Sequence, residues 1–381
     1  MNLKQLLAGG LMALAGVSAT AQPNPNLHIY LCLGQSNMVG QAPILSEDTT
    51  AVSDRLLSLC ATNGHDRKVG QWRKAVPPLC REYTHMGPSD FFGRTMVSFL
   101  PDSVSVGRVV VGVDGCASNL FDRDLQKAYV DSIKPDWMRA EVNAYDGNPR
   151  QRLVDMARLT QQRGVIRGII YHQGETDAYS DAWLTRMCKI YRDLLEDLHL
   201  SADSVPLLVG ETARKELGGV CAHANPTIDR MHDFLPTAWT ISSEGCEVSS
   251  DGAHFSHKGY ELLGRRYALR MLKLEGYDVA EQDTARLQTS PGAQASEEAE
   301  PAFKVETVVN GKRISVSAEV PMATIDMVSF SGQTVGVVRA NGVKKLNIHL
   351  KNLDDDRLFL VVKATDGRTV RTLVNVPLDR K

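Results

Sequence analysis

The feature that most constrains this sequence is an alternation of short β-branched runs with longer amphipathic segments, which extends from Leu27 to Tyr277. Such an alternation is typical of α/β domains, in which helices connect parallel strands. The expected strands are Leu27–Leu33, Ser105–Val113, Val165–Tyr171, Val205–Val209 and Trp239–Ser242. The second and third runs are apolar at both alternating sets of positions, which predicts strands buried on both faces. The sequence therefore predicts an α/β domain with a parallel five-stranded sheet.

Three helices are predicted between or after these strands. Arg152–Arg163 carries apolar residues on one face and is followed by Gly164, which favours a helix end. Ser180–Leu198 and Ser256–Leu274 are longer, and each opens with a serine that can cap a helix.

The N-terminal residues have the pattern of a signal peptide. Lys4 supplies a positive charge, Leu6–Val17 is an apolar stretch, and Ala19-Thr20-Ala21 matches a small-x-small cleavage site. The apolar stretch is too short to span a bilayer, and no other stretch is long and apolar enough. We therefore expect residues 1–21 to be removed after Ala21, and the protein to be secreted, periplasmic or on the cell surface.

Composition excludes some partners and leaves others open. A net charge of -2 gives no electrostatic reason to bind nucleic acid. The seven cysteines form no C-x-x-C pair, and no H-E-x-x-H motif is present, so we expect neither a metal nor another cofactor. In an oxidising compartment, Cys60–Cys80 and Cys221–Cys246 are candidate disulfides.

The chain divides into further segments after the α/β region. We expect the α/β domain to span 22–278, followed by a flexible linker over 279–302 and a small all-β sandwich domain over 303–381. The linker is rich in Ala, Gln, Ser and Glu, with few large apolar residues. In the last segment, alternating Val-rich runs are separated by turn-forming dipeptides, namely Asn310-Gly311, Ser331-Gly332, Asn341-Gly342 and Asp366-Gly367.

Four polar motifs lie where strands or loops end, at the edge where α/β sheets bind ligands. Leu33-Gly34-Gln35-Ser36-Asn37-Met38 presents a serine hydroxyl, although a serine there is as often a helix cap. Asp251-Gly252-Ala253-His254 spaces a carboxylate three residues before a histidine, so that the carboxylate can accept the imidazole Nδ1–H. By itself this motif is more often a polar turn.

The other two motifs follow the second and third strands. In Tyr171-His172-Gln173-Gly174-Glu175, the Gln173 amide could donate to an oxyanion and Glu175 could orient other residues. In Val113-Asp114-Gly115-Cys116, Gly115 lets a backbone N–H approach a ligand closely. Each is also compatible with an ordinary loop, but the four together are far more specific than any one.

Together the motifs resemble the SGNH/GDSL hydrolase superfamily, its sialate O-acetylesterase-type domain and, most closely, the acetylxylan esterases of carbohydrate esterase family six. The resemblance covers residues 28–274. It is carried by IYLCLGQSNMVGQA, PPLCREYTHMGPSDFFGRTMV, VGRVVVGVDGC, GIIYHQGETD, VPLLVGE and DGAHFSHKGYELLGRRYA. It implies a flavodoxin-like three-layer fold and a serine esterase that removes acetate from O-acetylated carbohydrate through an acetyl-serine intermediate.

The resemblance also implies roles for individual residues. Ser36 matches the nucleophile and His254 the base, while the Ser36 N–H, Gly115 and Gln173 match the oxyanion hole. Gln35 and Asn37 are expected to bind substrate. The acid is left open between Asp251, which the three-residue spacing favours, and Glu175. The sequence departs from the family at Asp114, where a glycine is usual, and at Thr176, where a serine is usual.

The expected substrate is acetylated xylan, with O-acetylated sialic acid as the alternative. Two rival functions are a non-catalytic carbohydrate-binding surface protein, which the complete set of Ser36, Asp251 and His254 disfavours, and a lipase-like esterase with a larger acyl pocket. The C-terminal segment resembles the sorting domain of the type nine secretion system, which implies secretion machinery as a partner. Its alternative is a purely structural sandwich. A sugar-binding module is disfavoured, because all four Trp and all ten Tyr precede the linker.

Overall fold

The centre of the α/β unit is a seven-stranded sheet in the order β3-β2-β4-β1-β5-β6-β7. The computed structural model describes residues 22–277, 279, 303–329, 334–350 and 357–375. The strands are β1 Leu27–Gly34, β2 Leu56–Leu59, β3 Trp72–Lys74, β4 Ser105–Gly112, β5 Val165–His172, β6 Leu207–Gly210 and β7 Ala238–Ile241. All pair in parallel except β3, which is antiparallel to β2. The five expected strands are confirmed, and the short β2 and β3, which were not predicted, extend the sheet beyond β4.

The order of the five expected strands is that of flavodoxin-like folds. In chain order they are β1, β4, β5, β6 and β7, and in the sheet they run β4-β1-β5-β6-β7. The chain adds β4 on one side of β1 and then crosses to add β5 on the other, so the strand order reverses at β1. Ligands bind at such a reversal, beyond the carboxyl ends of the strands.

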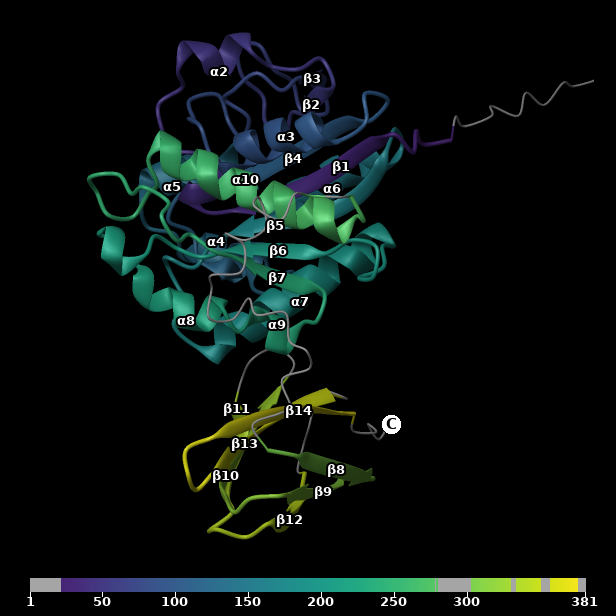
Figure 1. The fold of residues 1–381 in the computed structure, drawn as a ribbon, viewed down its shortest axis with the longest axis vertical. Helices are drawn as coiled ribbons and strands as arrows, with labels where there is room; N and C mark the ends of the chain where they lie inside the picture. The colour runs from purple at the N-terminus through teal and green to yellow at the C-terminus, as the bar shows by residue number, and fades with distance from the viewer. Residues whose placement is uncertain (1–21, 278, 280–302, 330–333, 351–356, 376–381) are drawn as a thin grey trace, which may run out of the picture.

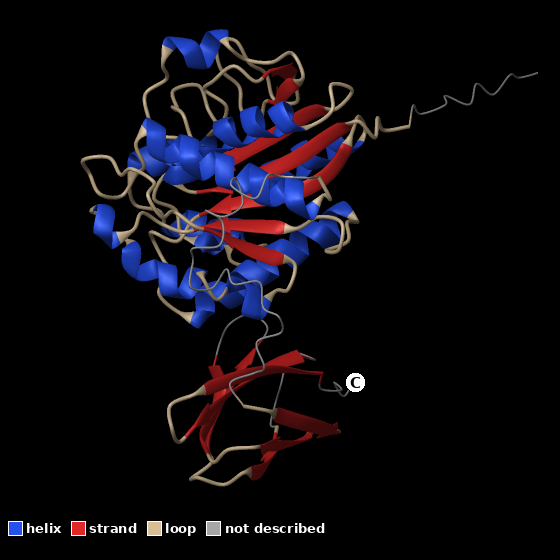
Figure 2. Cartoon of the chain, viewed as in Figure 1, coloured by secondary structure: helices blue, strands red, loops and turns tan. Residues whose placement is uncertain are grey.

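Helices cover both faces of this sheet, which makes three layers (Figures 1 and 2). Helices α3 Pro88–Phe99 and α10 His257–Leu274 pack on one face, and α6 Pro149–Gln161, α7 Asp181–Leu198 and α9 Met231–Phe234 on the other. All of β1 is buried, with Ile29 and Leu31 in one core and Tyr30 and Cys32 in the other. The shorter helices are α1 Ser36–Val39, α2 Ser46–Thr50, α4 Gln126–Ser132, α5 Asp136–Asn143, α8 Asn225–Ile228, η1 Ser118–Phe121, η2 Lys215–Leu217 and η3 Ala222–Ala224.

The three predicted helices are present, with differences at their ends. Helix α6 begins three residues earlier than expected, because the Asn148 side chain caps it by accepting from the Gln151 N–H. Ser256 caps α10 as expected, through the Gly259 N–H. Ser180 precedes α7, but its side chain makes no capping hydrogen bond.

The C-terminal unit consists of two antiparallel sheets, β11-β10-β13-β14 and β12-β9-β8. Their strands are β8 Val305–Asn310, β9 Arg313–Ala318, β10 Met322–Ser329, β11 Thr334–Arg339, β12 Lys345–His349, β13 Arg357–Ala364 and β14 Thr369–Asn375. Residues of both sheets, among them Ile314 and Val362, share one core, so this is the expected small sandwich. The turns at Asn310-Gly311 and Asp366-Gly367 join neighbouring strands as expected. The expected turn at Ser331-Gly332 and the expected signal peptide lie outside the described residues.

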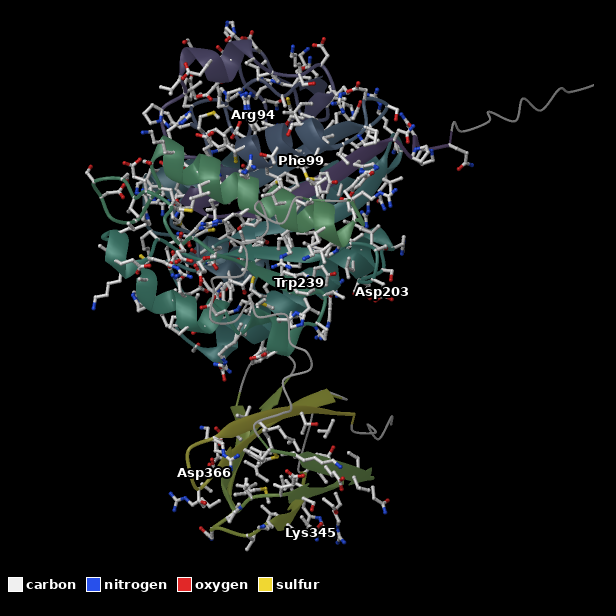
Figure 3. The ribbon with its side chains drawn as sticks, in the orientation of Figure 1. Arg94, Phe99, Asp203, Trp239, Lys345 and Asp366 are labelled. Carbon is white, nitrogen blue, oxygen red and sulfur yellow. The ribbon has the colours of Figure 1, made fainter. Side chains whose placement is uncertain are left out.

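The expected disulfides are wrong, because all seven cysteines are free thiols. Six are buried, and several of these have other partners; for example, the Cys80 thiol lies 3.2 Å from the Tyr145 hydroxyl, and Cys246 lies 3.7 Å from the Arg266 guanidinium. Figure 3 shows how side chains fill the layers, with Phe99 on α3 and Trp239 on β7. None of the described helices is long and apolar enough to cross a membrane.

Candidate active site

Ser36 lies at the carboxyl end of β1, where it opens the short helix α1. The loop that carries it passes close to the end of β5, because the Gln35 N–H donates to the His172 carbonyl oxygen at 3.0 Å. A Cβ atom on Gly34 would lie only 2.0 Å from the same oxygen, so this approach requires a glycine. The backbone N–H of Ser36 has no hydrogen-bond partner within the described part of the chain.

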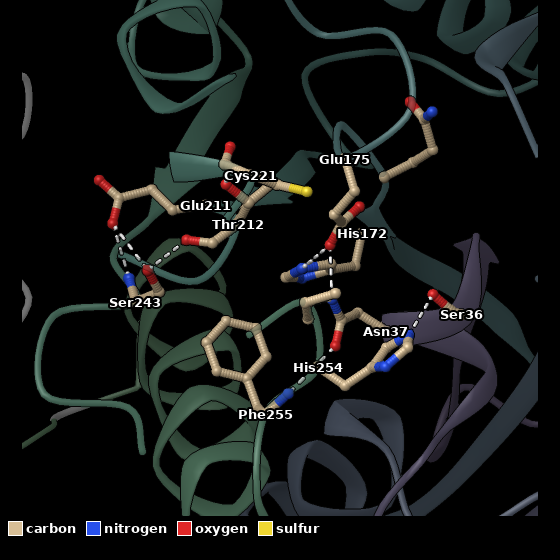
Figure 4. A network of polar contacts seen from close by, with 12 residues as sticks. Ser36, Asn37, His172, Glu175, Glu211, Thr212, Cys221, Ser243, His254 and Phe255 are labelled. Atoms are coloured by element: carbon tan, nitrogen blue, oxygen red, sulfur yellow. Dashed lines mark hydrogen bonds and ion pairs between the residues drawn. The ribbon is translucent and has the colours of Figure 1, made fainter. Parts of the chain in front are cut away.

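His254 links Ser36 to Asp251 through two hydrogen bonds. Its Nε2 lies 2.8 Å from the Ser36 Oγ, and its Nδ1 lies 2.7 Å from the Asp251 Oδ2. An ionised Asp251 can only accept, so Nδ1 carries the proton and Nε2 accepts the hydroxyl proton of Ser36. The structure thus brings together the three residues that the motifs singled out, from segments more than 200 positions apart. Figure 4 shows the contact between His254 and Ser36.

Asp251 is held in its ionised form by the loop around it. Its Oδ1 accepts from the Ser249 hydroxyl and from the backbone N–H groups of Ala253 and His254, at 2.7 to 2.9 Å. Burial would raise the pKa of Asp251, but these bonds and the one from the His254 side chain outweigh it and hold the pKa below its ordinary value. The carboxylate therefore remains an acceptor for the imidazole even in mildly acidic solution.

Glu175, the other candidate acid, lies on the far side of Asn37 from this chain (Figure 4). Its Oε1 accepts from the Asn37 Nδ2 at 2.5 Å and lies 3.5 Å from the His172 Nε2. Burial would raise the pKa of Glu175, but His172 and the Asn37 hydrogen bond outweigh it and lower that pKa. No hydrogen bond joins Glu175 to His254 among the described residues, so Glu175 reaches the histidine loop only through Asn37.

Asn37 is a buried bridge, which differs from the expected contact with substrate. Its side chain is fully buried; Nδ2 also donates to the Ala253 carbonyl oxygen at 3.0 Å, and Oδ1 accepts from the Tyr260 hydroxyl at 2.6 Å. Asn37 thereby ties the serine loop to the residue preceding His254. Gln35, also expected at the substrate, is 3% exposed, and its Oε1 lacks a partner in the described chain.

The Gly115 backbone faces the same end of the sheet. Gly115 has a φ of 63°, and its N–H has no hydrogen-bond partner in the part of the chain that is described. The Gln173 side chain, expected as a further donor, lies behind this loop: its NH₂ group donates to the Cys116 carbonyl oxygen and to Asp177, and its Oε1 accepts from Trp183. Both amide hydrogens are therefore in use, and Gln173 has none to offer an oxyanion in this structure.

Asp114, where the resemblance leads us to expect a glycine, has its polar partners on neighbouring segments. Its Oδ1 accepts from the Gln41 Nε2 at 3.3 Å and lies 3.9 Å from the Arg81 guanidinium. Glu141 pairs with Arg81 at 2.7 Å and accepts from the Asp114 N–H. Burial raises the pKa of Glu141 to about 7 despite Arg81. The Asp114 carboxylate thus has cationic and amide partners of its own.

Two site residues were missed by reasoning from the sequence. Trp137 on α5 is 53% exposed, and its ring lies 3.3 Å from where a Cβ of Gly115 would be. Buried Glu211, at the end of β6, pairs with Arg214 and accepts from the Ser243 N–H, which anchors the chain leading to His254 (Figure 4). The position of Glu211 in the VPLLVGE motif, directly after a predicted strand, is a signal from which it could have been found. The sequence offers no such signal for Trp137.

Comparison with known proteins gives one family and several similar structures. A model of the family described as carbohydrate esterase, sialic acid-specific acetylesterase, matches residues 26–273. A structure of an Arabidopsis thaliana protein is 20% identical, with a TM-score of 0.51, over 66% of this chain and 99% of that one. NanS is 15% identical (TM-score 0.48; 66% and 98% covered), and a carbohydrate acetylesterase from Xanthomonas citri is 14% identical (0.43; 90% and 80%). The plant protein shares the fold.

Proposed function

The chain belongs to the carbohydrate esterase, sialic acid-specific acetylesterase family, and we propose that it is an exported serine esterase that releases acetate from O-acetylated polysaccharide. Carbohydrate acetylesterase activity follows from the family. The proposal goes further in naming Ser36 as the nucleophile and acetylated xylan as the substrate. The observation that carries it is the chain of two hydrogen bonds from Ser36 through His254 to Asp251.

The proposed reaction has two halves with one covalent intermediate. Ser36 Oγ attacks the acetyl carbonyl carbon while His254 Nε2 takes the hydroxyl proton. The tetrahedral intermediate collapses, the bond to the sugar oxygen breaks, and that oxygen receives the proton from His254. Water, deprotonated by His254, then attacks the acetyl-serine, and the second collapse releases acetate and restores the Ser36 hydroxyl. Asp251 keeps the imidazole in the required tautomer and stabilises its charged form.

The oxyanion is proposed to bind the backbone N–H groups of Ser36 and Gly115. What supports this is that both groups lack partners within the described chain and lie on loops that leave adjacent strands, since Gly34 pairs with Gly112. Each donor of this kind is worth roughly 3 to 4 kcal/mol in the transition state. Gln173 then has a positioning role, because it donates to the Cys116 carbonyl oxygen next to Gly115.

Acetylated xylan is proposed over O-acetylated sialic acid because the sequence motifs resemble most closely the acetylxylan esterases. The test is acetate release from both substrates by the wild type and by Ser36→Ala. We expect release from xylan that falls by a factor on the order of 10⁴ or more in the variant. Release from sialic acid alone would keep the serine mechanism and overturn the substrate. No release from either, nor from short-chain model esters, would overturn the catalytic proposal.

Export is a further part of the proposal. We propose cleavage after Ala21, a hydrolase domain over 22–278, a linker over 279–302, and a C-terminal domain over 303–381 that acts as a sorting signal for type nine secretion. The supports are the signal-like N-terminal sequence and the sandwich fold of the last segment. The mass of the mature protein tests both steps: a mature chain that begins at Gln22 and ends near the linker is expected, and an intact C-terminal segment would contradict the sorting role.

A further inference from the structure

A cavity of about 440 Å³ lies beside the serine loop. It is lined by Gly40 and Gln41, which follow α1, and by Asp114, which precedes Gly115. Gly40 is four residues beyond Ser36, or about 6 Å along a helix. Because β1 and β4 are paired in register up to Gly34 and Gly112, the two loops that form this cavity leave the sheet side by side. When Ser36 attacks the acetyl group of an acetylated sugar, the sugar therefore lies next to this cavity.

The charged residues of the cavity are mainly acidic. Its lining contains one arginine, Arg81, one histidine, His85, and three carboxyl groups, those of Glu82, Asp114 and Glu141. The arginine is already in use, because its guanidinium pairs with Glu141 at 2.7 Å and also donates to the Gly112 carbonyl oxygen. No lysine lines the cavity. A ligand with a carboxylate would thus come close to Glu82 and Asp114, beside a Glu141 that is partly protonated near pH 7, and would find the arginine already paired. Like charges that come close cost binding energy.

The same lining suits the hydroxyl groups of a sugar. Asp114 is partly exposed and has acceptor capacity beyond the single bond from Gln41, since a carboxylate has about four lone-pair sites. The half-exposed ring of Trp137 lies outside this lining but against Gly115, the residue after Asp114, and offers a flat apolar surface. Trp137 and Glu141 stand four positions apart on α5, so they lie on one side of that helix.

We propose that this cavity binds the sugar from which acetate is removed, with Asp114 accepting its hydroxyl groups and Trp137 packing against its ring, and that it selects neutral sugars over sugars that carry a carboxylate. The inference rests on the proposed esterase function and refines its substrate class. It also gives the departure from the family at Asp114 a role in specificity instead of in the oxyanion hole.

The test compares kcat/KM for three esters: acetylated xylan, O-acetylated sialic acid, and a small aryl acetate that has no sugar to fill the cavity. Asp114→Asn removes the charge and retains one acceptor. We expect it to lower kcat/KM on acetylated xylan about tenfold, mainly through KM, because a charged acceptor makes the stronger hydrogen bond. Asp114→Asn should change kcat/KM on the aryl acetate less than twofold, and it should raise kcat/KM on O-acetylated sialic acid.

Trp137→Ala is the second variant and should show the same contrast between xylan and aryl acetate without the gain on sialic acid. Asp131→Asn, an exposed carboxylate paired with Lys127 on α4, controls for a change of net charge. Equal losses on xylan and aryl acetate would mean that Asp114 supports the oxyanion loop, and a wild type that prefers sialic acid would also overturn the proposal. A wild type inactive on all three esters would instead overturn the esterase function itself.

Discussion

Two segments of the proposed active site each supply a carboxylate and a histidine three positions apart, yet the two pairs differ in burial and in hydrogen-bond partners. Asp251 and His254 are partly exposed; their side chains bond directly to each other, and His254 bonds to Ser36. His172 and Glu175 are buried, and they contact the serine loop only through Asn37 and the backbone. Both pairs have the same three-residue spacing, but the carboxylate precedes the histidine in the first pair and follows it in the second.

This difference separates the proposed reacting chain, which is Ser36, His254 and Asp251, from the frame of buried residues that holds it in place, which is Asn37, His172 and Glu175. In the partly exposed pair, His254 can exchange protons with substrate and water while Asp251 stays ionised. The buried pair fixes Asn37, and Asn37 in turn holds the Ala253 carbonyl oxygen and the Phe255 N–H on either side of His254. We therefore expect substitutions in the first pair to change the rate of reaction, and substitutions in the second to change mainly the free energy of unfolding.

Among substitutions in these two pairs, the largest effect on rate is expected for Asp251→Asn. The variant leaves no anion to hold the Nδ1–H tautomer, so kcat on acetylated xylan should fall by a factor on the order of 10³. Its melting temperature should stay close to that of the wild type, because half of the side chain is exposed. Steady-state kinetics and thermal unfolding of the same preparation provide the two measurements. A kcat within tenfold of the wild type would exclude Asp251 as the partner of His254.

Much of this arrangement could be predicted from the sequence, because it depends on local patterns. Strands β1, β4 and β5 are eight residues long and mostly buried, so their composition marks them clearly. Ser36, His254 and Asp251 stand in short motifs at strand ends or within one loop. The sheet order then follows from the rules that govern such alternating chains.

What could not be predicted depends on long-range contacts. Strands β2 and β3 have only four and three residues, too few to show a period of two. Glu175 could not be separated from Asp251, since the choice depends on which carboxylate reaches His254 across the fold. Asn37 reads as an exposed polar residue beside a nucleophile, and its burial becomes visible only when Tyr260 and Glu175 are brought to it.

A smaller effect on rate is expected for Glu175→Gln, which keeps an acceptor for Asn37 and loses the charge beside His172. We expect kcat to stay within about tenfold of the wild type and the melting temperature to fall. Glu175→Ala leaves the buried Asn37 amide without this acceptor, and its unfolding free energy should drop by about 3 kcal/mol. If Glu175→Gln instead lowered kcat by about 10³-fold and left the melting temperature unchanged, Glu175 would be the acid of the triad.

The pH dependence of the unfolding free energy in Glu175→Gln tests whether the charge of Glu175 stabilises the fold. The pKa of Glu175 is lowered in the folded protein, so its ionised form adds to the unfolding free energy above the ordinary glutamate range near pH 4, and this addition is lost as the pH falls through the lowered value. Glutamine cannot ionise. The difference in unfolding free energy between the wild type and Glu175→Gln should therefore be largest near pH 7 and shrink below about pH 4, as urea denaturation at both pH values would measure. If this difference were the same at both pH values, the charge of Glu175 would not stabilise the fold. Glu175 would then contribute only through its packing beneath Asn37.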